Sequence, residues 1–453
     1  MMASPPRIPL RRADWGAREA AALLGGLRPG QARTLADIWP ANTPNPYGQA
    51  LLLRSGRQAL LLALSLADSD KPRVVIPSFL CRAVADAILA AGKQPRFVDI
   101  GDDLNVTAQA VEQALDDTVS AVIVPHMFGK PAQIDQIEAL CRRRGVLLID
   151  DAAAAMGIQH AGRPLGSFGQ AGIFSFAQQK SLTAGQGGAL VAPAQTLERL
   201  AGQLTGRPLS GIGLFREAAW WMWEYPIHYR WPRLRASLAR RLGLGPAKLL
   251  SQPCQPMPGR YAAALAVQVR RMDRILQTRQ ENCRMLQERL GQIAGLAIPQ
   301  YYAFCQLTRL IVRISGLRWP AAALSGTAEK GNGHPLARRL AELGIESART
   351  YLPLHMHADL ASFADRALPA TEQLVPELVA LPTLGRLSQR DCDAIASAIG
   401  EFCRAGSAAA AAPPPIVPPL ATGSTARLQR AGQVEQPVGA RAGSDTSPSG
   451  AHP

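Results

Sequence analysis

Apolar and polar positions alternate in a regular way along the first half of the chain. Short runs rich in valine and isoleucine predict buried strands at 73–77, 96–100, 121–125 and 146–150. Between these runs, apolar residues recur at the spacing of one helix face, which predicts helices at 58–67, 83–91, 108–115 and 134–144. Because the strands are apolar along their whole length and alternate with helices, we expect a mainly parallel sheet with helices on both faces.

The second half of the chain has a different pattern. Apolar residues at helical spacing over 261–290 predict one long helix that connects two domains. Beyond it, the pattern predicts a strand at 307–314 and helices at 335–343 and 372–380, a mixture that indicates a smaller α+β domain. After residue 404, an alanine and proline tract precedes a tail with hardly any large apolar residues, which cannot bury enough surface to fold.

These patterns divide the chain into four parts. We expect an N-terminal arm over 1–35, a large α/β domain over 36–260, a connecting helix with the small α+β domain over 261–404, and a disordered tail over 405–453. The large domain carries an insertion at 205–258 in which tryptophans and arginines are interleaved. Three interpretations of this insertion are open: it packs on the domain or on a partner subunit, it contacts an anionic membrane surface through 205–250, or it covers the substrate as a lid.

Composition and charge narrow the classes of function. The 453 residues are 47% apolar and 18% charged, which describes a globular protein large enough for two or more domains. The net charge of +15 suggests anionic partners, but no compact Lys/Arg run stands out, so we do not expect nucleic-acid binding. The seven cysteines are scattered and never form a Cys-x-x-Cys pair, which argues against a disulfide framework or a metal site and favours a reducing compartment. The sequence shows no signal peptide and no run of roughly 18 apolar residues, so we expect a cytoplasmic protein.

One lysine lies in an unusual setting. Lys180 stands between an apolar run that begins at Gly172 and a glycine-rich turn over 185–188, and Ser175 precedes it by five residues. Glycines allow the backbone to pass close to a bound group. A lysine held in this way could form a Schiff base beside an anion site, although an ordinary surface lysine is the alternative.

Two further features lie where the predicted sheet would place a ligand. Asp151 follows an apolar strand and precedes four alanines, so its carboxylate could hold a pyridinium nitrogen protonated, or it could cap the following turn. Ser55 and Gly56 open a predicted helix, whose first N–H groups could bind a phosphate, although many helices begin in this way. Both features fall at the carboxyl ends of strands or at a helix start, where α/β sheets bind their ligands.

Taken in chain order, these motifs point to one family. The colinear segments are Ser-Gly-Arg-Gln-Ala-Leu at 55–60, Val-Ile-Pro-Ser-Phe at 75–79, Phe-Val-Asp-Ile at 97–100, Pro-His-Met-Phe-Gly-Lys-Pro-Ala at 125–132, Leu-Ile-Asp-Asp-Ala-Ala at 148–153, the Lys180 stretch, Tyr-Leu-Pro-Leu-His at 351–355 and Leu-Pro at 381–382. Over about residues 48–403 the chain resembles the sugar aminotransferases of the DegT/DnrJ/EryC1/StrS type. The resemblance implies fold type I, that of aspartate aminotransferase, with pyridoxal 5′-phosphate (PLP) as cofactor and no metal.

The resemblance also assigns roles by position. It implies Lys180 as the Schiff-base and proton-transfer lysine, Asp151 as the partner of the pyridine nitrogen, and Ser175 as a phosphate ligand. The implied cofactor-binding positions are Gly56, Arg57, Gln58, Cys81, Asp151, Ser175 and Lys180, with the backbone of 56–58 at the phosphate and Cys81 at the ring. Tyr351 and His355 fall in the segment that lines the sugar-nucleotide pocket in relatives; from the sequence alone, an ordinary loop histidine is the alternative for His355.

Several positions depart from the family pattern. Arg57 stands where threonine is usual, so a hydroxyl ligand of the phosphate is missing, although an arginine could replace it ionically. Cys81 replaces the aromatic residue that stacks on the ring, and Ala154 replaces a glutamine near the phenolic oxygen of the cofactor. The segment 177–179 has changed from Tyr-Pro-Thr, and a partner-subunit asparagine falls near Gln255. This drift favours either a divergent enzyme or a catalytically degenerate member that acts by binding or regulation.

The expected function is transfer of an amino group from glutamate or glutamine to a nucleotide-linked keto-sugar. The product would feed surface polysaccharide or a glycosylated metabolite. Dehydratases of the family carry histidine in place of the lysine, so Lys180 argues against that reaction. Relatives are homodimers that share residues between sites, so the resemblance also implies a homodimer.

Overall fold

The computed structural model of the protein describes residues 8–10, 15–25, 32–41, 43–204, 253–298, 308–314, 335–383 and 387–411. The chain divides into a compact unit of residues 1–408 and a second unit, 409–453, of which only the last residues of a helix are described. Most of the insertion predicted at 205–258 and most of the predicted tail lie outside the described residues. None of the described helices is long and apolar enough to cross a membrane.

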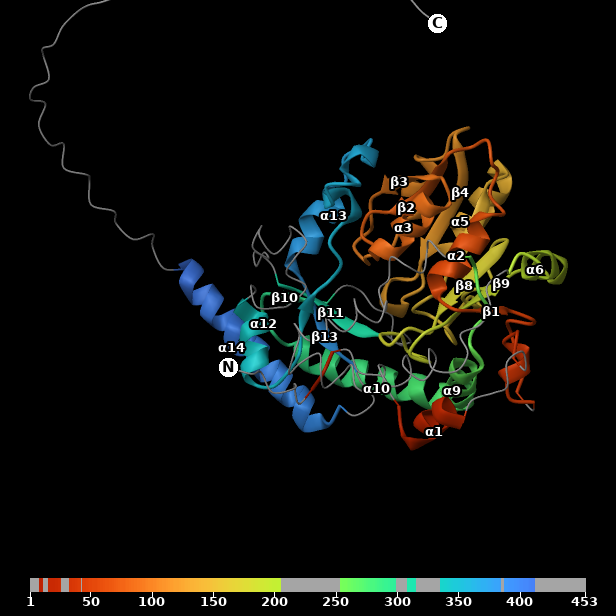
Figure 1. The fold of residues 1–453 in the computed structure, drawn as a ribbon. Helices are drawn as coiled ribbons and strands as arrows, with labels where there is room; N and C mark the ends of the chain where they lie inside the picture. The colour runs from red at the N-terminus through yellow and green to blue at the C-terminus, as the bar shows by residue number, and fades with distance from the viewer. Residues whose placement is uncertain are drawn as a thin grey trace, which may run out of the picture. The chain divides into compact units, whose positions relative to one another are not determined.

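A mainly parallel seven-stranded sheet forms the centre of the large domain (Figure 1). Its strand order is β1-β9-β8-β5-β4-β2-β3, and β1 and β9 run antiparallel to their neighbours, whereas the other pairs are parallel. The strands are β1 (Leu51–Leu53), β2 (Arg73–Pro77), β3 (Gln94–Val98), β4 (Val119–Pro125), β5 (Leu147–Asp151), β8 (Ala171–Ser175) and β9 (Gly188–Val191). A separate short hairpin pairs β6 (Gln159–His160) with β7 (Arg163–Pro164).

Helices bury both faces of this sheet. Along β2, Val74 and Ile76 belong to one hydrophobic cluster and Val75 to the other, as the two-residue period of a strand requires. The first cluster includes apolar residues of α2 (Gly56–Leu64) and α3 (Arg82–Ala90), and the second those of α4 (Ala108–Glu112), α5 (Ile134–Arg144) and α9 (Gly259–Arg270). The prediction of an α/β fold with a sheet covered on both faces is confirmed.

Other helices complete the large domain and lead out of it. α1 (Ala17–Gly25) packs on α9, and α6 (Ala194–Ala201) follows β9. The predicted connecting helix consists of two, because α9 ends at Arg270 and α10 (Met272–Leu290) begins after Arg271, whose φ of −107° and ψ of 5° are not helical. Short 3₁₀ turns occur at Ala36–Ile38, Met127–Gly129, Leu354–Met356, Ala361–Phe363 and Val375–Glu377.

The small domain contains a four-stranded antiparallel sheet in the order β10-β11-β13-β12. Its elements are β10 (Leu296–Ala297), β11 (Arg309–Ile314), α12 (Pro335–Glu342), β12 (Ala348–Arg349), α13 (Pro369–Leu374), β13 (Leu378–Pro382) and α14 (Gln389–Ala411). Helix α14 continues past residue 405, the predicted start of the tail, because the alanines that follow have the highest helix propensity.

The helix predicted at 372–380 is wrong over its second half. The helical segment ends at Leu374, a 3₁₀ turn containing Pro376 follows, and Leu378 begins strand β13. Strand β13 pairs with β11 on one side and β12 on the other, and all of its residues are buried. Proline disfavours the helical conformation of the residue before it, and the buried apolar run after it satisfies its backbone by pairing in the sheet.

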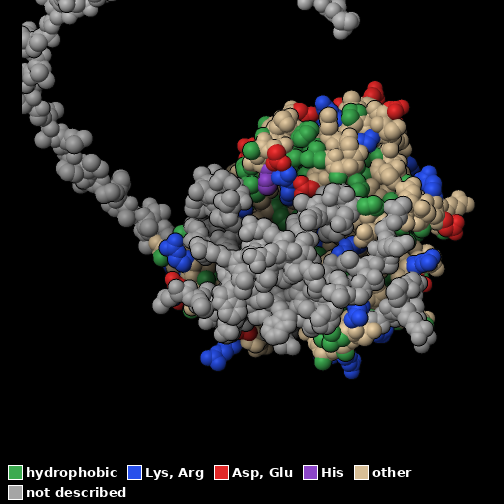
Figure 2. All heavy atoms as spheres, in the orientation of Figure 1, with side chains coloured by type: hydrophobic (Ala, Val, Ile, Leu, Met, Phe, Trp, Pro, Cys, Tyr) green, Lys and Arg blue, Asp and Glu red, His purple; other side chains and the backbone are tan. Residues whose placement is uncertain are grey.

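Basic and acidic side chains lie interspersed on the face shown in Figure 2. Several of the described arginines are paired with carboxylates. Arg82 contacts Asp86 at 2.7 Å and Asp359 at 2.5 Å, and Arg163 contacts Glu138 at 2.7 Å. Part of the positive charge of the chain is thus neutralised locally.

Candidate active site

The N-terminus of helix α2 lies directly against the ends of strands β8 and β9. A Cβ on Gly56 would come within 2.8 Å of the Ser175 Cβ, and a Cβ on Gly188 within 2.4 Å of the Gly56 nitrogen. Real Cβ atoms do not approach other atoms so closely, so both positions require glycine. This close approach brings the first amides of α2 and the Ser175 hydroxyl into one place.

The amides at this helix start differ in what they can bind. Ser55 caps α2, and its Oγ accepts the N–H of Gln58 at 3.2 Å. The N–H groups of Gly56 and Arg57 precede the first intrahelical bond of α2 and have no hydrogen-bond partner in the described part of the chain. We call these two amides together with the Ser175 hydroxyl the anion site, because helix N-termini bind anions.

Gln58 has a structural role in addition to its predicted one. Its side chain is buried, donates from Nε2 to the Pro253 carbonyl at 3.1 Å, and accepts the Gln255 N–H at 3.2 Å. The Gln255 carbonyl also accepts the Arg54 N–H at 3.0 Å. These bonds hold the segment that contains Gln255 against the first turn of α2.

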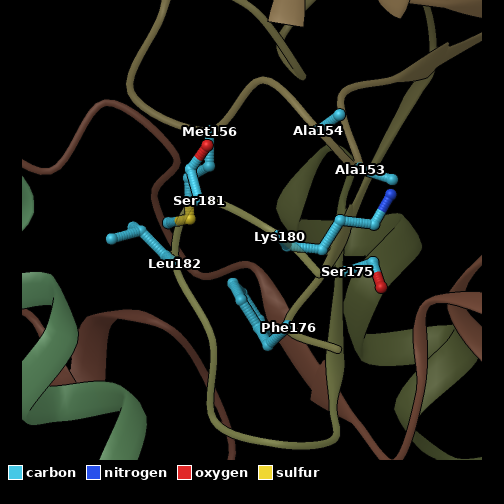
Figure 3. A pocket seen from close by; sticks show the side chains of 8 residues that line it. All are labelled: Ala153, Ala154, Met156, Ser175, Phe176, Lys180, Ser181 and Leu182. Carbon is cyan, nitrogen blue, oxygen red and sulfur yellow. The ribbon is translucent and has the colours of Figure 1, made fainter. Parts of the chain in front are cut away.

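Lys180 lies in a pocket beside the anion site. Figure 3 shows its side chain extending toward Ala153, with Ser175 beside it and Leu182 on the opposite side. The pocket is lined by Ala153, Ala154, Met156, Ser175, Phe176, Lys180, Ser181 and Leu182. Ala154, the position where the family pattern has glutamine, is therefore a neighbour of Lys180.

A hydrogen-bonded loop holds Lys180 in this position. The Lys180 N–H donates to the Ala177 carbonyl at 3.0 Å, and the Phe176 carbonyl accepts from the N–H of Ala184 and from the Thr183 hydroxyl. Gly187 has a φ of 123°, a conformation that L side chains rarely adopt, so the predicted need for glycine in this turn is confirmed.

Asp151 ends strand β5 and is almost completely buried. Its Oδ1 accepts the Ala153 N–H at 3.0 Å, which is the turn-capping role considered from the sequence. Its other oxygen has no hydrogen-bond partner among the described residues. Burial raises the pKa of the Asp151 carboxyl, and the charge of nearby Lys180 partly offsets this effect. An unpartnered carboxylate oxygen in such a site can accept a proton-bearing group of a ligand.

In Asp150, the residue before it, both carboxylate oxygens already accept hydrogen bonds. Its Oδ1 lies 2.8 Å from His126 Nε2, and its Oδ2 accepts the N–H groups of Gly166 at 2.6 Å and Phe168 at 3.1 Å. His126 Nδ1 accepts the Ala132 N–H at 3.0 Å, so the ring proton is on Nε2, facing the carboxylate. The sequence placed His126 at a strand end but did not reveal this buried pair, whose members are 24 residues apart.

Arg57 and Cys81 lie near one another beside the anion site. Both residues are half-buried; Arg57 is the second residue of α2, and Cys81 is the N-cap of α3. The buried Nε of Arg57 has no hydrogen-bond partner among the described residues. Burial lowers the pKa of Arg57, and the nearby Cys81 and Asp86 oppose this shift.

Tyr351 and His355 are not part of the pocket lining around Lys180. The Tyr351 ring stacks on Phe128, with centroids 5.9 Å apart and planes 8° from parallel. His355 Nδ1 lies 2.6 Å from the Ser78 hydroxyl, and its Nε2 lies 3.4 Å from a Glu372 oxygen. These contacts connect the segment that contains Tyr351 and His355 to the loops after β2 and β4. Sequence reasoning placed Ser78 after a strand but did not identify its contact with His355, nor Glu372, because nothing local marks such long-range pairs.

Comparison with known proteins decides which family this site belongs to. The model of the DegT/DnrJ/EryC1/StrS aminotransferase family matches residues 47–222 and 256–400, well over half of the chain. The chain belongs to the DegT/DnrJ/EryC1/StrS aminotransferase family. The expected fold type I, the PLP cofactor and the assignment as an aminotransferase are confirmed at the level of the family.

The relatives include enzymes of sugar biosynthesis. The chain is 40% identical over 148 residues to UDP-N-acetyl-3-dehydro-alpha-D-glucosamine 3-aminotransferase of Acidithiobacillus ferrooxidans, a match that spans 32% of this chain and 40% of the relative. The solved aminotransferase TlmJ of Streptoalloteichus hindustanus is 26% identical, with a TM-score of 0.64 over 89% of this chain and all of that one. Helicobacter pylori PseC, an aminotransferase involved in pseudoaminic acid biosynthesis, is 16% identical and supports the fold, with a TM-score of 0.66 over 88% of this chain and 99% of that one.

The described residues fit PLP. The close contact of Gly56 with Ser175 leaves two amides and a hydroxyl for a phosphate, and the second Asp151 oxygen is available for the ring nitrogen. Lys180 lies on the same side of the sheet, in the pocket that includes Ser175. The phosphate end and the ring end of PLP thus each have a protein group that is able to bind them.

Proposed function

We propose that this chain transfers an amino group to a keto-sugar carried on a nucleotide, with PLP as its cofactor. The observation that carries the proposal is that Lys180 lines one pocket with Ser175 of the anion site, while its charge acts on nearby Asp151, whose second oxygen has no partner among the described residues. The relative from Acidithiobacillus ferrooxidans, whose name specifies a UDP-linked 3-keto-sugar, supports this class of substrate.

In this proposal PLP is bound at both of its ends. The amides of Gly56 and Arg57 and the Ser175 hydroxyl would hold its phosphate, and Asp151 would keep its ring nitrogen protonated. Cys81 would lie at the ring, the position that the family resemblance gives it. The Gln58 N–H, assigned to the phosphate by the family resemblance, is engaged by Ser55 in this structure, so we propose a supporting role for Gln58. When bound, PLP supplies an electron sink that stabilises negative charge on the carbon bearing the amino group.

Lys180 is the acid–base residue in this proposal. Its Nζ would hold the cofactor and would accept and return the proton of the reacting carbon. The hydrogen bonds of the loop over 176–187 keep this amine on the Ser175 side of the pocket. The buried Asp151 carboxylate favours a positive partner, since an unpaired charge at such a site is costly.

The proposal also covers the amino donor, the fate of the product, the oligomeric state and the residues on the substrate side. We propose glutamate or glutamine as the amino donor, with a product that enters surface polysaccharide or a glycosylated metabolite, and a homodimer that works in the cytoplasm. Tyr351 and His355 are proposed to shape the sugar-nucleotide side of the site from the segment after β12, which contacts the loops after β2 and β4.

The test is an absorbance spectrum of the purified protein before and after borohydride, compared with Lys180→Ala. We expect a band in the near-ultraviolet or visible range that borohydride removes and that the variant lacks. Amino donors and UDP-linked keto-sugars would then be screened by formation of the amino sugar. A wild-type protein that stays colourless with added PLP would contradict the proposal and favour a catalytically degenerate member that acts by binding.

A further inference from the structure

Arg57 is a cation beside the anion site that has no partner in the described part of the chain. It follows Gly56 in the first turn of α2, and its guanidinium is half-buried. Within the described residues Arg57 makes no hydrogen bond or ion pair, and its buried Nε has no acceptor. A buried arginine nitrogen without an acceptor is unfavourable for the folded protein, and a ligand of opposite charge would relieve this.

The carboxylate whose charge acts on Arg57 already has another partner. Asp86, the acidic group that acts on Arg57 over distance, accepts from Arg82 Nε at 2.7 Å. Arg82 is bound in turn by Asp359 of the small domain at 2.5 Å. Because Arg82 pairs with both Asp86 and Asp359, Arg57 has no protein counter-ion among the residues described.

The position of Arg57 directs it to the anion site. Arg57 follows Gly56, which contacts Ser175, and side chains of a helix generally lean toward its N-terminus, so we infer that the guanidinium can reach the anion site. An arginine binds a phosphate through charge-assisted hydrogen bonds, which are about twice as strong as neutral ones.

We propose that the guanidinium of Arg57 is a direct ligand of the cofactor phosphate and neutralises its charge. This role goes beyond the backbone amide of Arg57 and rests on the proposed function only in that the bound anion is the phosphate of PLP. Arg57 thereby turns the anion site into a strong binding site for any phosphate dianion, including inorganic phosphate in the cofactor-free protein.

The experiment compares full-length wild type with Arg57→Ala, Arg57→Lys and Arg57→Thr. Arg284→Ala, which removes one exposed arginine from α10, is the control for net charge. The dissociation constant of PLP is measured by fluorescence titration at two salt concentrations. Thermal melting of the cofactor-free proteins is measured with inorganic phosphate and with chloride at equal ionic strength.

We expect Arg57→Ala to weaken PLP binding roughly 10- to 100-fold, the range for loss of one hydrogen bond to a charged group. Arg57→Lys should retain part of the affinity, and Arg57→Thr should bind PLP with less dependence on salt than wild type. Phosphate should raise the melting temperature of wild type and Arg284→Ala but not of Arg57→Ala. In chloride, cofactor-free Arg57→Ala should be at least as stable as wild type, since no unpaired charge is buried.

Equal affinity of wild type and Arg57→Ala for both PLP and inorganic phosphate would overturn the proposal. So would a variant that binds PLP normally but has a raised KM for the nucleotide-sugar, because the ligand of Arg57 would then be the substrate. A wild-type protein that binds inorganic phosphate through Arg57 but not PLP would refute the proposed function and leave the phosphate site in place.

Discussion

Two adjacent aspartates at the end of β5 have opposite surroundings. Asp150 accepts three hydrogen bonds, from His126 and from two backbone amides, whereas Asp151 accepts one and has an oxygen without a partner in the described structure. The side chains alternate across the sheet, so one carboxylate joins the packed face and the other faces the pocket side. The first maintains the fold and the second is available for a ligand.

Exchange of each aspartate for asparagine separates the two roles. Asp150→Asn should lower the free energy of unfolding by about 2–3 kcal/mol, because charge-assisted bonds to buried donors are lost. Asp151→Asn should unfold near the wild-type midpoint but lower the rate of amination by at least about 100-fold, the effect of losing an electrostatic group that acts in the transition state. Urea denaturation and single-turnover rates test both expectations, and a wild-type rate for Asp151→Asn would remove its proposed role.

Helix α13 is attached to the large domain by residues distant in sequence. Asp99, which follows β3, accepts the N–H of Ala370 and both the N–H and hydroxyl of Thr371 at 2.6–2.8 Å. His355 adds a second connection, since its backbone N–H donates to the Ser78 Oγ at 3.3 Å, and the Ser78 hydroxyl in turn faces its Nδ1. With Nδ1 as acceptor, the ring proton is on Nε2, toward Glu372.

The environment of His355 predicts a dependence of stability on pH. Burial lowers the pKa of His355 below 6.5, although Glu372 and Asp99 oppose this shift. Below pH 6.5 His355 takes up a proton in the unfolded chain more readily than in the folded chain. The contribution of His355 to the free energy of unfolding is therefore complete above pH 6.5 and decreases as the pH falls toward the folded pKa. We expect the urea midpoint to decrease as the pH falls below 6.5, and His355→Asn to reduce that slope.

His357, two residues after His355, offers a second variant for the same measurement. Burial also lowers the pKa of His357, with Arg82 acting in the same direction, so His357→Asn should remove a separate part of the slope. The double variant should show the sum of the two reductions. An unchanged slope in His355→Asn would contradict the assignment of the neutral ring.

The elements that sequence predicted correctly are those with an unambiguous pattern. Strand β2 coincides with the predicted 73–77, because its residues are apolar on both faces, and α5 coincides with 134–144, because its apolar positions repeat at helical spacing. The segment that contains β13 is apolar at both spacings, and only its pairing with β11 and β12 decides the outcome. Likewise, the link between Ser78 and His355 spans 277 residues and leaves no local trace in the sequence.

At the scale of the whole chain, the candidate site follows from the topology of the sheet. Ser78, His126 and Asp151 are at the carboxyl ends of the parallel strands β2, β4 and β5, where ligands of α/β sheets bind. The sequence predicted this edge of the sheet. It could not predict that α2 would contact β8 and β9 so closely, since those strands are more than a hundred residues further along the chain.

Cofactor binding should therefore stabilise the folded chain as a whole. At a PLP concentration 100 times its dissociation constant, the expected gain is about 2.7 kcal/mol. Gly188→Ala should remove this gain, because its Cβ would collide with the Gly56 nitrogen and displace the anion site. Gly202→Ala is the control, as its Cβ meets only ordinary contacts of 3.4 Å and longer. Thermal melting with and without PLP measures the gain, and an equal shift in both variants would contradict this view of the site.

The antiparallel pairing of β1 with β9 has a consequence for how the protein is made. A ribosome that has released the chain only as far as β5 has produced Gly56 and Asp151 but not Ser175, Lys180 or Gly188. The nascent chain can assemble β2 to β5 during synthesis, yet it has no complete place for a cofactor until Val191 has left the exit tunnel. The chain can thus bind its cofactor only late in its synthesis. A chain with bound cofactor is one in which β9 has been inserted between β1 and β8.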